Sequence, residues 1–240
     1  MRALAIVHQR DAGPGVFADA VRSSGAELDL WLVAEQASPP REPGRYDAVL
    51  SFGGAMHADH EDRHPWLRQE KELLAELLER GVPMLGVCLG AQLLAEAAGA
   101  PARRASEPEI GWYDVKVAAE AAGDPLVGPL GSRFEAFGWH SYELPLPSGA
   151  TPLAHSASCL QAYRLGNEAW GIQFHAEVTM GEVGAWIDDY RADEDAVRIG
   201  LDPDALRRRS EGAIGRWNEI GRGICERFVS AAAQSSSGVT

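Results

Sequence analysis

The stretch Pro83-Met-Leu-Gly-Val-Cys-Leu-Gly-Ala-Gln92 is an apolar run that ends at a cysteine with a glycine two residues away on each side. Gly86-Val-Cys-Leu-Gly90 has the spacing of a nucleophile elbow, the sharp turn from a strand to a helix that exposes a nucleophile. Side chains at the two flanking positions would collide with neighbouring backbone, and glycine removes that clash. We therefore expect a buried strand that ends at Cys88.

The position of Cys88 also predicts a reactive thiol. A helix over Ala91–Ala98, which Gly99 is placed to end, would follow the turn. The dipole and free N–H groups at its N-terminus favour thiolate over thiol. Cys159 and Cys225 have no basic or glycine-rich setting, so we expect them to be inert. Three widely spaced cysteines suit a reducing compartment and argue against a disulfide framework or a zinc site.

Further apolar runs extend this pattern over the first half of the chain. Strands are expected at Ala3–Val7, Leu28–Val33, Ala48–Phe52 and Met84–Val87. Helical periodicity lies between them at Gly15–Ser24 and Pro65–Arg80. This alternation predicts a single α/β domain with a central, mostly parallel sheet flanked by helices. Ligands bind such sheets at the carboxyl ends of the strands, which is where Cys88 lies.

The second half changes character. Short strand-like segments between Gly, Pro and Ser turns predict an additional β portion folded back onto the same sheet. These segments are Trp112–Val117, Arg133–Phe137, Thr151–Ala154, Cys159–Leu165 and Ala169–Phe174. Helices are expected from Thr179 to Ala233, with breaks near Asp193–Glu194 and at Asp202-Pro203. We assign residues 1–233 to the domain and 234–240 to a disordered polar tail.

Composition narrows the function. The 240 residues carry 22 basic and 35 acidic side chains, a net charge of −13 that disfavours nucleic acids and anionic membranes as partners. No apolar run approaches the ~20 residues that span a bilayer, and Met1–His8 is too short for a signal peptide. We expect a cytoplasmic protein. Neither a phosphate-binding loop nor a cofactor motif occurs in the sequence.

A cysteine nucleophile needs a base and a group that orients the base. Gly171-Ile-Gln-Phe-His-Ala-Glu-Val178 places His175 and Glu177 two residues apart at the end of an expected strand, so both can point to the same side. Ser51-Phe-Gly-Gly-Ala55 offers donors for an oxyanion through Gly53 and Gly54, beside the Leu89 N–H of the elbow.

Taken together, these motifs resemble the class I (triad-type) glutamine amidotransferase family. The resemblance rests on Phe52-Gly-Gly54, Gly86-Val-Cys-Leu-Gly-Ala-Gln92 and Gly171-Ile-Gln-Phe-His-Ala-Glu177, in the family's order and at comparable spacing. It implies a flavodoxin-like fold and a GMP-synthase-like, stand-alone amidotransferase domain.

The resemblance also implies roles for single residues. Cys88 attacks the glutamine amide, His175 passes a proton to the departing ammonia, and Glu177 orients His175. Gln92 helps to hold the substrate beside the elbow. Ser141, in Trp139-His-Ser-Tyr142, lies where the family grips the amino-acid end of the substrate, largely through backbone groups.

Two positions depart from the family pattern. Ala176 stands where the family usually has proline, and alanine adopts the same extended conformation without enforcing it. We therefore expect a less rigid His-x-Glu segment. The loop Met56–Pro65 also differs, which leaves the outer pocket and the choice of substrate open.

Other candidates have simpler explanations. The three histidines of the loop alternate with acids, which suggests a metal site, but their spacing favours a solvated acidic loop; the residues are His57, Asp59, His60, Glu61, Asp62 and His64. His140 and His155 have no acid two residues away, so His175 is the preferred base. Trp186 and Trp217 are expected in the core or an interface, and Glu109-Ile-Gly-Trp112 as packing beside the site.

Two enzymatic functions and one non-enzymatic function remain. The chain is too short to hold a synthetase as well, so it is either a glutaminase subunit that serves a separate synthetase or a free-standing hydrolase of γ-glutamyl amides. The first hypothesis is thioester hydrolysis of glutamine to glutamate and ammonia. The alternatives are a γ-glutamyl peptide hydrolase and a regulatory protein that retains the fold.

Overall fold

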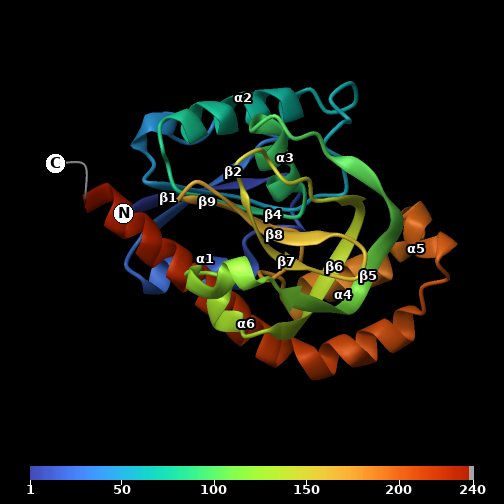
Figure 1. Ribbon diagram of the computed structural model, residues 1–240. Coiled ribbons are helices and arrows are strands. Elements are labelled where there is room, and N and C mark those ends of the chain that lie inside the picture. The colour runs from blue at the N-terminus through green and yellow to red at the C-terminus, as the bar shows by residue number, and fades with distance from the viewer. Residues whose placement is uncertain (238–240) are drawn as a thin grey trace.

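A nine-stranded mixed sheet forms the centre of the protein (Figure 1). The structure, a computed structural model, describes residues 1–237. The strand order is β2-β1-β3-β4-β9-β8-β7-β5-β6, in which neighbours from β2 to β9 run parallel and those from β9 to β6 antiparallel. The strands are β1 (Arg2–Val7), β2 (Glu27–Leu32), β3 (Ala48–Ser51), β4 (Met84–Val87), β5 (Arg103–Val117), β6 (Arg133–Glu143), β7 (Thr151–His155), β8 (Leu160–Leu165) and β9 (Ala169–Ile172). The predicted α/β fold with an additional β portion on the same sheet is confirmed, and that portion is antiparallel.

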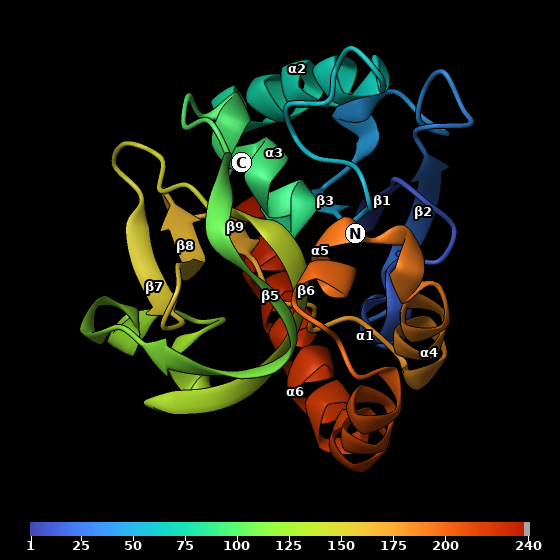
Figure 2. The same cartoon turned by 90° about the vertical axis from the view of Figure 1, so that its right-hand side faces the viewer.

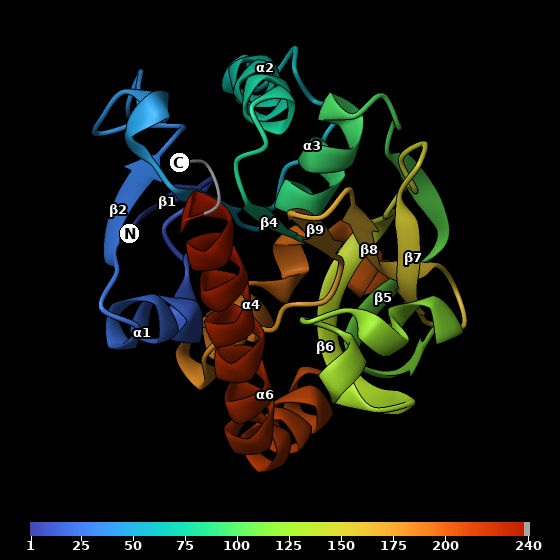
Figure 3. The ribbon, with the colours of Figure 1, turned by 60° about the vertical axis from the view of Figure 1, so that its left-hand side comes forward.

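Helices cover both faces of the parallel half of the sheet. Helices α1 (Gly15–Ser23) and α6 (Pro203–Ser237) lie on one face, and α2 (Trp66–Glu79) and α3 (Leu89–Ala97) on the other, as Figure 3 shows. Helix α4 (Met180–Asp188) packs against α6, and the short α5 (Glu194–Arg198) follows it. Single turns of 3₁₀ helix complete the described elements: η1 (Pro43–Arg45), η2 (Ala119–Gly123), η3 (Gly128–Leu130) and η4 (Tyr190–Ala192).

Burial follows from this layering. Strand β4, between β3 and β9, is buried along its whole length, as the continuous apolar run Met84–Val87 predicts for a central parallel strand. On the α6 face, Trp170, Trp217 and Phe228 are almost fully buried in one apolar cluster. A second cluster joins the sheet to α2 and α3. Apolar packing therefore covers both faces of the sheet at β4, the central strand that ends just before Cys88.

Three predicted strand boundaries were wrong by two residues or more. Strand β5 begins at Arg103 instead of Trp112, because the polar residues before Trp112 pair with β6 through a register shift between Arg104 and Glu109. Strand β6 likewise extends beyond Phe137 to Glu143. Strand β9 ends at Ile172, so His175 and Glu177 lie beyond the strand that was expected to carry them.

The C-terminal helix is longer than the sequence suggested. Helix α6 continues through Ser237, so residues 234–237 are helical and do not begin a disordered tail. A helix break at Pro203 and another near Asp193 occur where they were predicted. The rest of the predicted tail, 238–240, lies outside the described residues.

Candidate active site

Cys88 forms a strained turn between β4 and α3. Its φ of 51° is the one positive φ of a non-glycine residue among residues 1–237. A Cβ atom on Gly86 would lie 2.6 Å from the Ala91 Cα atom, and one on Gly90 would lie 2.2 Å from the Ser51 carbonyl oxygen. Because both obstacles are backbone atoms, only glycine fits. The elbow that the sequence predicted is therefore formed.

His175 and Glu177 reach the cysteine from an irregular segment after β9. The His175 Nδ1 atom is 2.7 Å from a Glu177 carboxylate oxygen, and both side chains are buried. The backbone N–H of His175 leaves the β9 ladder and donates to the Phe137 carbonyl at 2.8 Å. The structure thus brings together the three side chains that the sequence grouped as a triad.

The electrostatics of His175 depend on both neighbours. Burial opposes its charged form, but the Glu177 carboxylate and then the Cys88 sulfur, which is hydrogen-bonded to the ring, outweigh burial and raise the pKa of His175 to about 10. The Cys88 Sγ atom also lies 3.9 Å from the Trp139 carbonyl oxygen. An imidazolium between a carboxylate and a sulfur is the arrangement that a proton donor to a leaving amine requires.

Helices α6 and α1 fix the backbone of the segment around Ala176. Its carbonyl groups are engaged one after another: Trp217 Nε1 donates to His175 O at 2.7 Å, Val16 N–H to Glu177 O at 2.8 Å, and Asn218 Nδ2 to Val178 O at 2.7 Å. The Ala176 carbonyl itself faces Gly221 of α6, where a Cβ atom would lie only 1.9 Å away. These contacts restrain the segment where a proline would otherwise do so, which argues against the expected looser segment.

The loop Phe52–Ala55, which the sequence predicts to supply oxyanion donors and which we therefore call the oxyanion loop, lies against this pair of side chains. A Cβ atom on Gly53 would be 2.7 Å from His175 Cε1 and 3.7 Å from Cys88 Cβ, so the loop approaches as closely as backbone can. Gly54 and Leu89 line the same pocket as Cys88. The Leu89 N–H, at the first position of α3, has no acceptor within the helix and is free for an anion.

Gln92 and Ser141 line the pocket as well. Gln92 is buried, and its amide nitrogen donates to Gln173 Oε1 at 3.0 Å and more weakly to the Tyr142 carbonyl at 3.4 Å. Only its side-chain oxygen remains for a ligand. Ser141 is hydrogen-bonded to Asp195 of α5, which helps to hold the pKa of that carboxyl below its usual range against the effect of burial.

The pocket extends well beyond these residues. Its volume is about 710 Å³, and its walls include residues of the loop Met56–Pro65 and of the segment from Asp189 to Asp195. Figure 2 shows α5 beside β5 and β6. Arg104 of β5 binds Asp195 at 2.6 Å, and Trp139 Nε1 donates to Asp193 at 2.8 Å, so these bonds fix the α5 wall to the sheet.

The model of the family "Glutamine amidotransferase class-I" matches residues 15–188 of this chain. The chain belongs to this family. The match ends with α4, so the pocket wall from Asp189 to Asp195 and helix α6 lie outside it. The glutamine amidotransferase-like protein YfeJ of Salmonella typhimurium is 30% identical over 187 residues, which cover 76% of this chain and 78% of that protein.

The names of two further relatives describe different reactions. A subunit of the glutamine-hydrolyzing GMP synthase of Saccharolobus solfataricus is 31% identical over 68% of this chain and 83% of its own length. A gamma-glutamyl-L-1-hydroxyisopropylamide hydrolase of Pseudomonas is 31% identical over 57% of this chain and 48% of its own length. The crystal structure of a glutamine amidotransferase from Thermotoga maritima superimposes with a TM-score of 0.85 at 30% identity, covering 95% of this chain and 98% of that one.

The sequence predicts two tryptophans, Trp186 and Trp217, in the core or an interface, and in the structure both contact the candidate site. The Trp186 ring lies edge-on to the His175 ring, 4.9 Å between centroids, and lines the pocket. Trp217 is buried as expected, but its indole N–H holds the His175 backbone. Neither contact has a local signal, because the tryptophans come from helices that meet His175 only in the fold.

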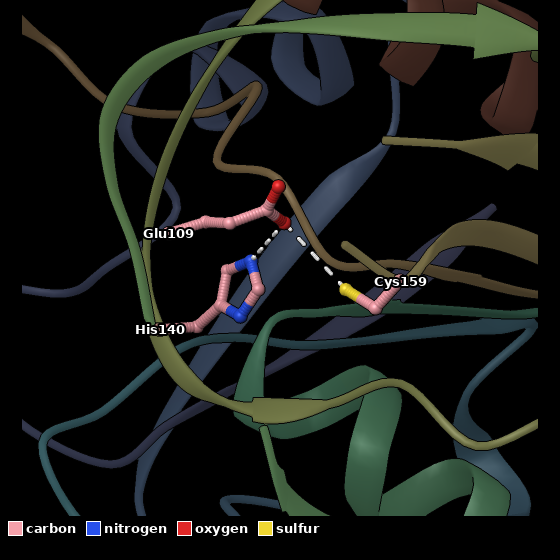
Figure 4. Close-up of side chains that lie close together, drawn as sticks. All are labelled: Glu109, His140 and Cys159. Atoms are coloured by element: carbon pink, nitrogen blue, oxygen red, sulfur yellow. Dashed lines mark hydrogen bonds and ion pairs between the residues drawn. The ribbon is translucent and has the colours of Figure 1, made fainter. Parts of the chain in front are cut away.

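His140 has an acidic partner after all. Glu109, opposite it on β5, places a carboxylate oxygen 3.3 Å from His140 Nε2, and Cys159 donates to the same oxygen at 3.5 Å (Figure 4). These three groups are close enough to be considered as metal ligands. Gln161 Nε2, however, donates to the same carboxylate oxygen at 2.7 Å, and burial raises the pKa of the Cys159 thiol to about 12. Hydrogen bonds therefore account for the cluster, and Cys159 is a poor nucleophile, as expected.

No helix within residues 1–237 combines the length and the apolar character needed to cross a membrane.

Proposed function

We propose that this protein hydrolyses the γ-carboxamide of glutamine through a thioester on Cys88 and releases glutamate and ammonia. The observation that carries the proposal is the hydrogen-bonded series Cys88–His175–Glu177 at the elbow, facing a pocket that the oxyanion loop also lines. A thiol, a base and an orienting carboxylate are the groups that acyl transfer from an amide requires.

In the proposed reaction the Cys88 sulfur attacks the γ-carbonyl carbon, and the carbonyl oxygen becomes an oxyanion. Leu89 N–H and the amides of Gly53 and Gly54 are the donors placed to stabilise it. The C–N bond breaks as His175 gives its proton to the departing nitrogen. Water then loses a proton to His175 and attacks the thioester, which frees glutamate and restores the thiol. Glu177 keeps the imidazole oriented throughout.

Where the ammonia goes depends on the partner. One relative is named as a subunit of GMP synthase, which supports the proposal that this chain too serves a synthetase made as another chain.

A second substrate class is favoured by the size of the pocket. At about 710 Å³ it is far larger than glutamine needs, so it has room for an amide with a larger leaving amine. The relative named as a γ-glutamyl alkylamide hydrolase supports this alternative. The chemistry at Cys88 is the same for both.

The test is product release from purified protein. We expect glutamate and ammonia to form from glutamine, and Cys88→Ala to abolish both while the protein stays folded. Cys159→Ala is the matched control and keeps the activity, since this thiol lies outside the pocket-lining residues. Release of glutamate from γ-glutamyl alkylamides or peptides alone would favour the second substrate class. Undiminished turnover by Cys88→Ala would refute both.

A further inference from the structure

A second buried histidine–carboxylate pair lies behind the oxyanion loop. His8, directly after β1, places Nε2 2.7 Å from a carboxylate oxygen of Glu70 on α2. The Ser51 hydroxyl donates to the other Glu70 oxygen at 2.7 Å. The side chains of His8 and Glu70 are fully buried, and the His8 ring stacks on Trp66 with 5.4 Å between centroids. A buried carboxylate is retained at this depth only with such partners.

The second ring nitrogen of His8 reaches the oxyanion loop. Its Nδ1 atom is 3.0 Å from the carbonyl oxygen of Gly53. When Glu70 is ionised, both ring nitrogens of His8 face acceptors, so the ring carries a proton on each of them. Burial opposes this charged form, but the charge and hydrogen bond of Glu70 outweigh burial and raise the pKa of His8.

We propose that His8, held as an imidazolium by Glu70, is the positioning residue of the oxyanion loop and acts through the Gly53 carbonyl. The proposal rests on the proposed function, because it assigns a task to the loop only if an oxyanion forms there. A donor at the Gly53 carbonyl fixes the plane of the peptide that joins Gly53 to Gly54, and with it the direction of the Gly54 N–H. Charge assistance makes this a strong hydrogen bond.

The loop needs an external support. Phe52, Gly53 and Gly54 follow β3 without secondary structure of their own, and glycine gives them wide conformational freedom. The far end of the loop is held by Gln9, whose side-chain oxygen accepts from Ala55 N–H at 2.7 Å. Two consecutive residues after β1 therefore hold the loop at Gly53 and at Ala55. His8 supplies the charged, fully buried contact. It holds Gly53, the loop residue that lies against His175.

Two variants separate positioning from general support. His8→Phe/Glu70→Met removes both members of the pair, so that no buried charge is left unpaired and the ring still stacks on Trp66. Glu70→Gln is the conservative control: its amide donates to neutral His8, which keeps Nδ1–H on the Gly53 carbonyl, and its oxygen still accepts from Ser51. We expect the double variant to lower kcat on the order of 10²–10³-fold with little change in KM, because oxyanion contacts strengthen in the transition state. Glu70→Gln stays within about tenfold of the wild type.

The rate at which iodoacetamide alkylates Cys88 separates the two roles, because general damage to the site would change this rate. It reports on the Cys88–His175 pair, whose hydrogen bonds to each other and to Glu177 include no atom of the loop, so the double variant is expected to react at the wild-type rate. The proposal is overturned if a folded double variant keeps wild-type kcat. It is also overturned if alkylation falls together with kcat, or if Glu70→Gln loses as much activity as the double variant.

A second measurement needs no turnover, so that failure of the proposed function is recognised separately. In ¹⁵N-histidine spectra we expect both ring nitrogens of His8 to be protonated. The ¹³C signal of the Gly53 carbonyl should shift in the double variant and hold nearly still in Glu70→Gln. If no γ-glutamyl amide is hydrolysed, the proposed function fails. An unprotonated Nδ1 atom or an unmoved Gly53 signal overturns the positioning role whatever the substrate is.

Discussion

Substitution of Gly221 by alanine tests how the His-x-Glu segment is held. Gly221 lies on α6 against the carbonyl of Ala176, which stands between His175 and Glu177 in sequence. A Cβ atom there would sit 1.9 Å from the Ala176 oxygen and 3.3 Å from a Val16 methyl group. Ordinary contact begins at 3.4 Å, so the helix and the segment must separate by about 1.5 Å.

The size of this shift sets the expected effect. Overpacking of this kind costs about 1–3 kcal/mol of stability, which lowers Tm by about 2–12 °C in a domain of this size. A misplacement of about 1 Å at reacting groups costs on the order of 10²-fold in rate. We therefore expect Gly221→Ala to lose at least that factor in kcat for glutamine hydrolysis while it remains folded at 25 °C.

Gly215→Ala is the matched control. Gly215 lies on the same helix, and a Cβ atom added to it would have nothing within 4 Å, so alanine there stabilises the helix by about 0.5–1 kcal/mol and leaves kcat unchanged. The assays are thermal unfolding by circular dichroism and release of glutamate. Wild-type kcat and Tm in Gly221→Ala would refute the reasoning, as would an equal loss in both variants.

Three further perturbations probe the same site. Gly53→Ala places a methyl group 2.7 Å from His175 Cε1, and we expect it to lower kcat on the order of 10²-fold or more while far-ultraviolet circular dichroism stays unchanged. Trp217→Phe keeps the apolar ring but removes the donor to the His175 carbonyl, so denaturant unfolding should show a loss of about 1–3 kcal/mol, and no loss would contradict the bond. Because the pKa of His175 is raised to about 10 in the folded protein, its contribution to stability is complete below pH 6.5 and is lost as the pH rises toward 10. The stability difference between the wild type and His175→Gln/Glu177→Gln should shrink over that range, and a constant difference would contradict the assigned pair.

The elements nearest Cys88 were predictable because their signals are local. The glycines around Cys88 remove clashes with backbone only a few residues away or on the next strand, and the apolar run before it is a central strand. The start of β5 was not predictable, since its polar residues are held by pairing with β6 and not by burial. Helix α6 reaches Ser237 through a polar sequence that resembles a tail.

The residues that we propose carry the chemistry were found by motif, whereas the residues that hold them in place were missed. The sequence places His175 beside Glu177, but the donor to the His175 carbonyl is Trp217, far along the chain. Likewise His8 meets Glu70 62 positions away, and His140 meets Glu109 across a ladder. Such pairs depend on strand order and helix packing, which a single sequence does not encode locally. Alanine in place of proline at position 176 suggested a loose His-x-Glu segment for the same reason. The contact that restrains this segment comes from Gly221 of α6, which the local sequence does not reveal.

The most direct test of the account is mass spectrometry of the acylated enzyme. Wild-type protein is mixed with glutamine, quenched with acid and digested, and a parallel sample is treated with the glutamine analogue 6-diazo-5-oxo-norleucine. We predict a γ-glutamyl thioester and a stoichiometric covalent adduct, both on the peptide that contains Cys88 and neither on Cys159 or Cys225. A fully active enzyme whose adduct maps to another residue, or that forms none, would contradict the central claim.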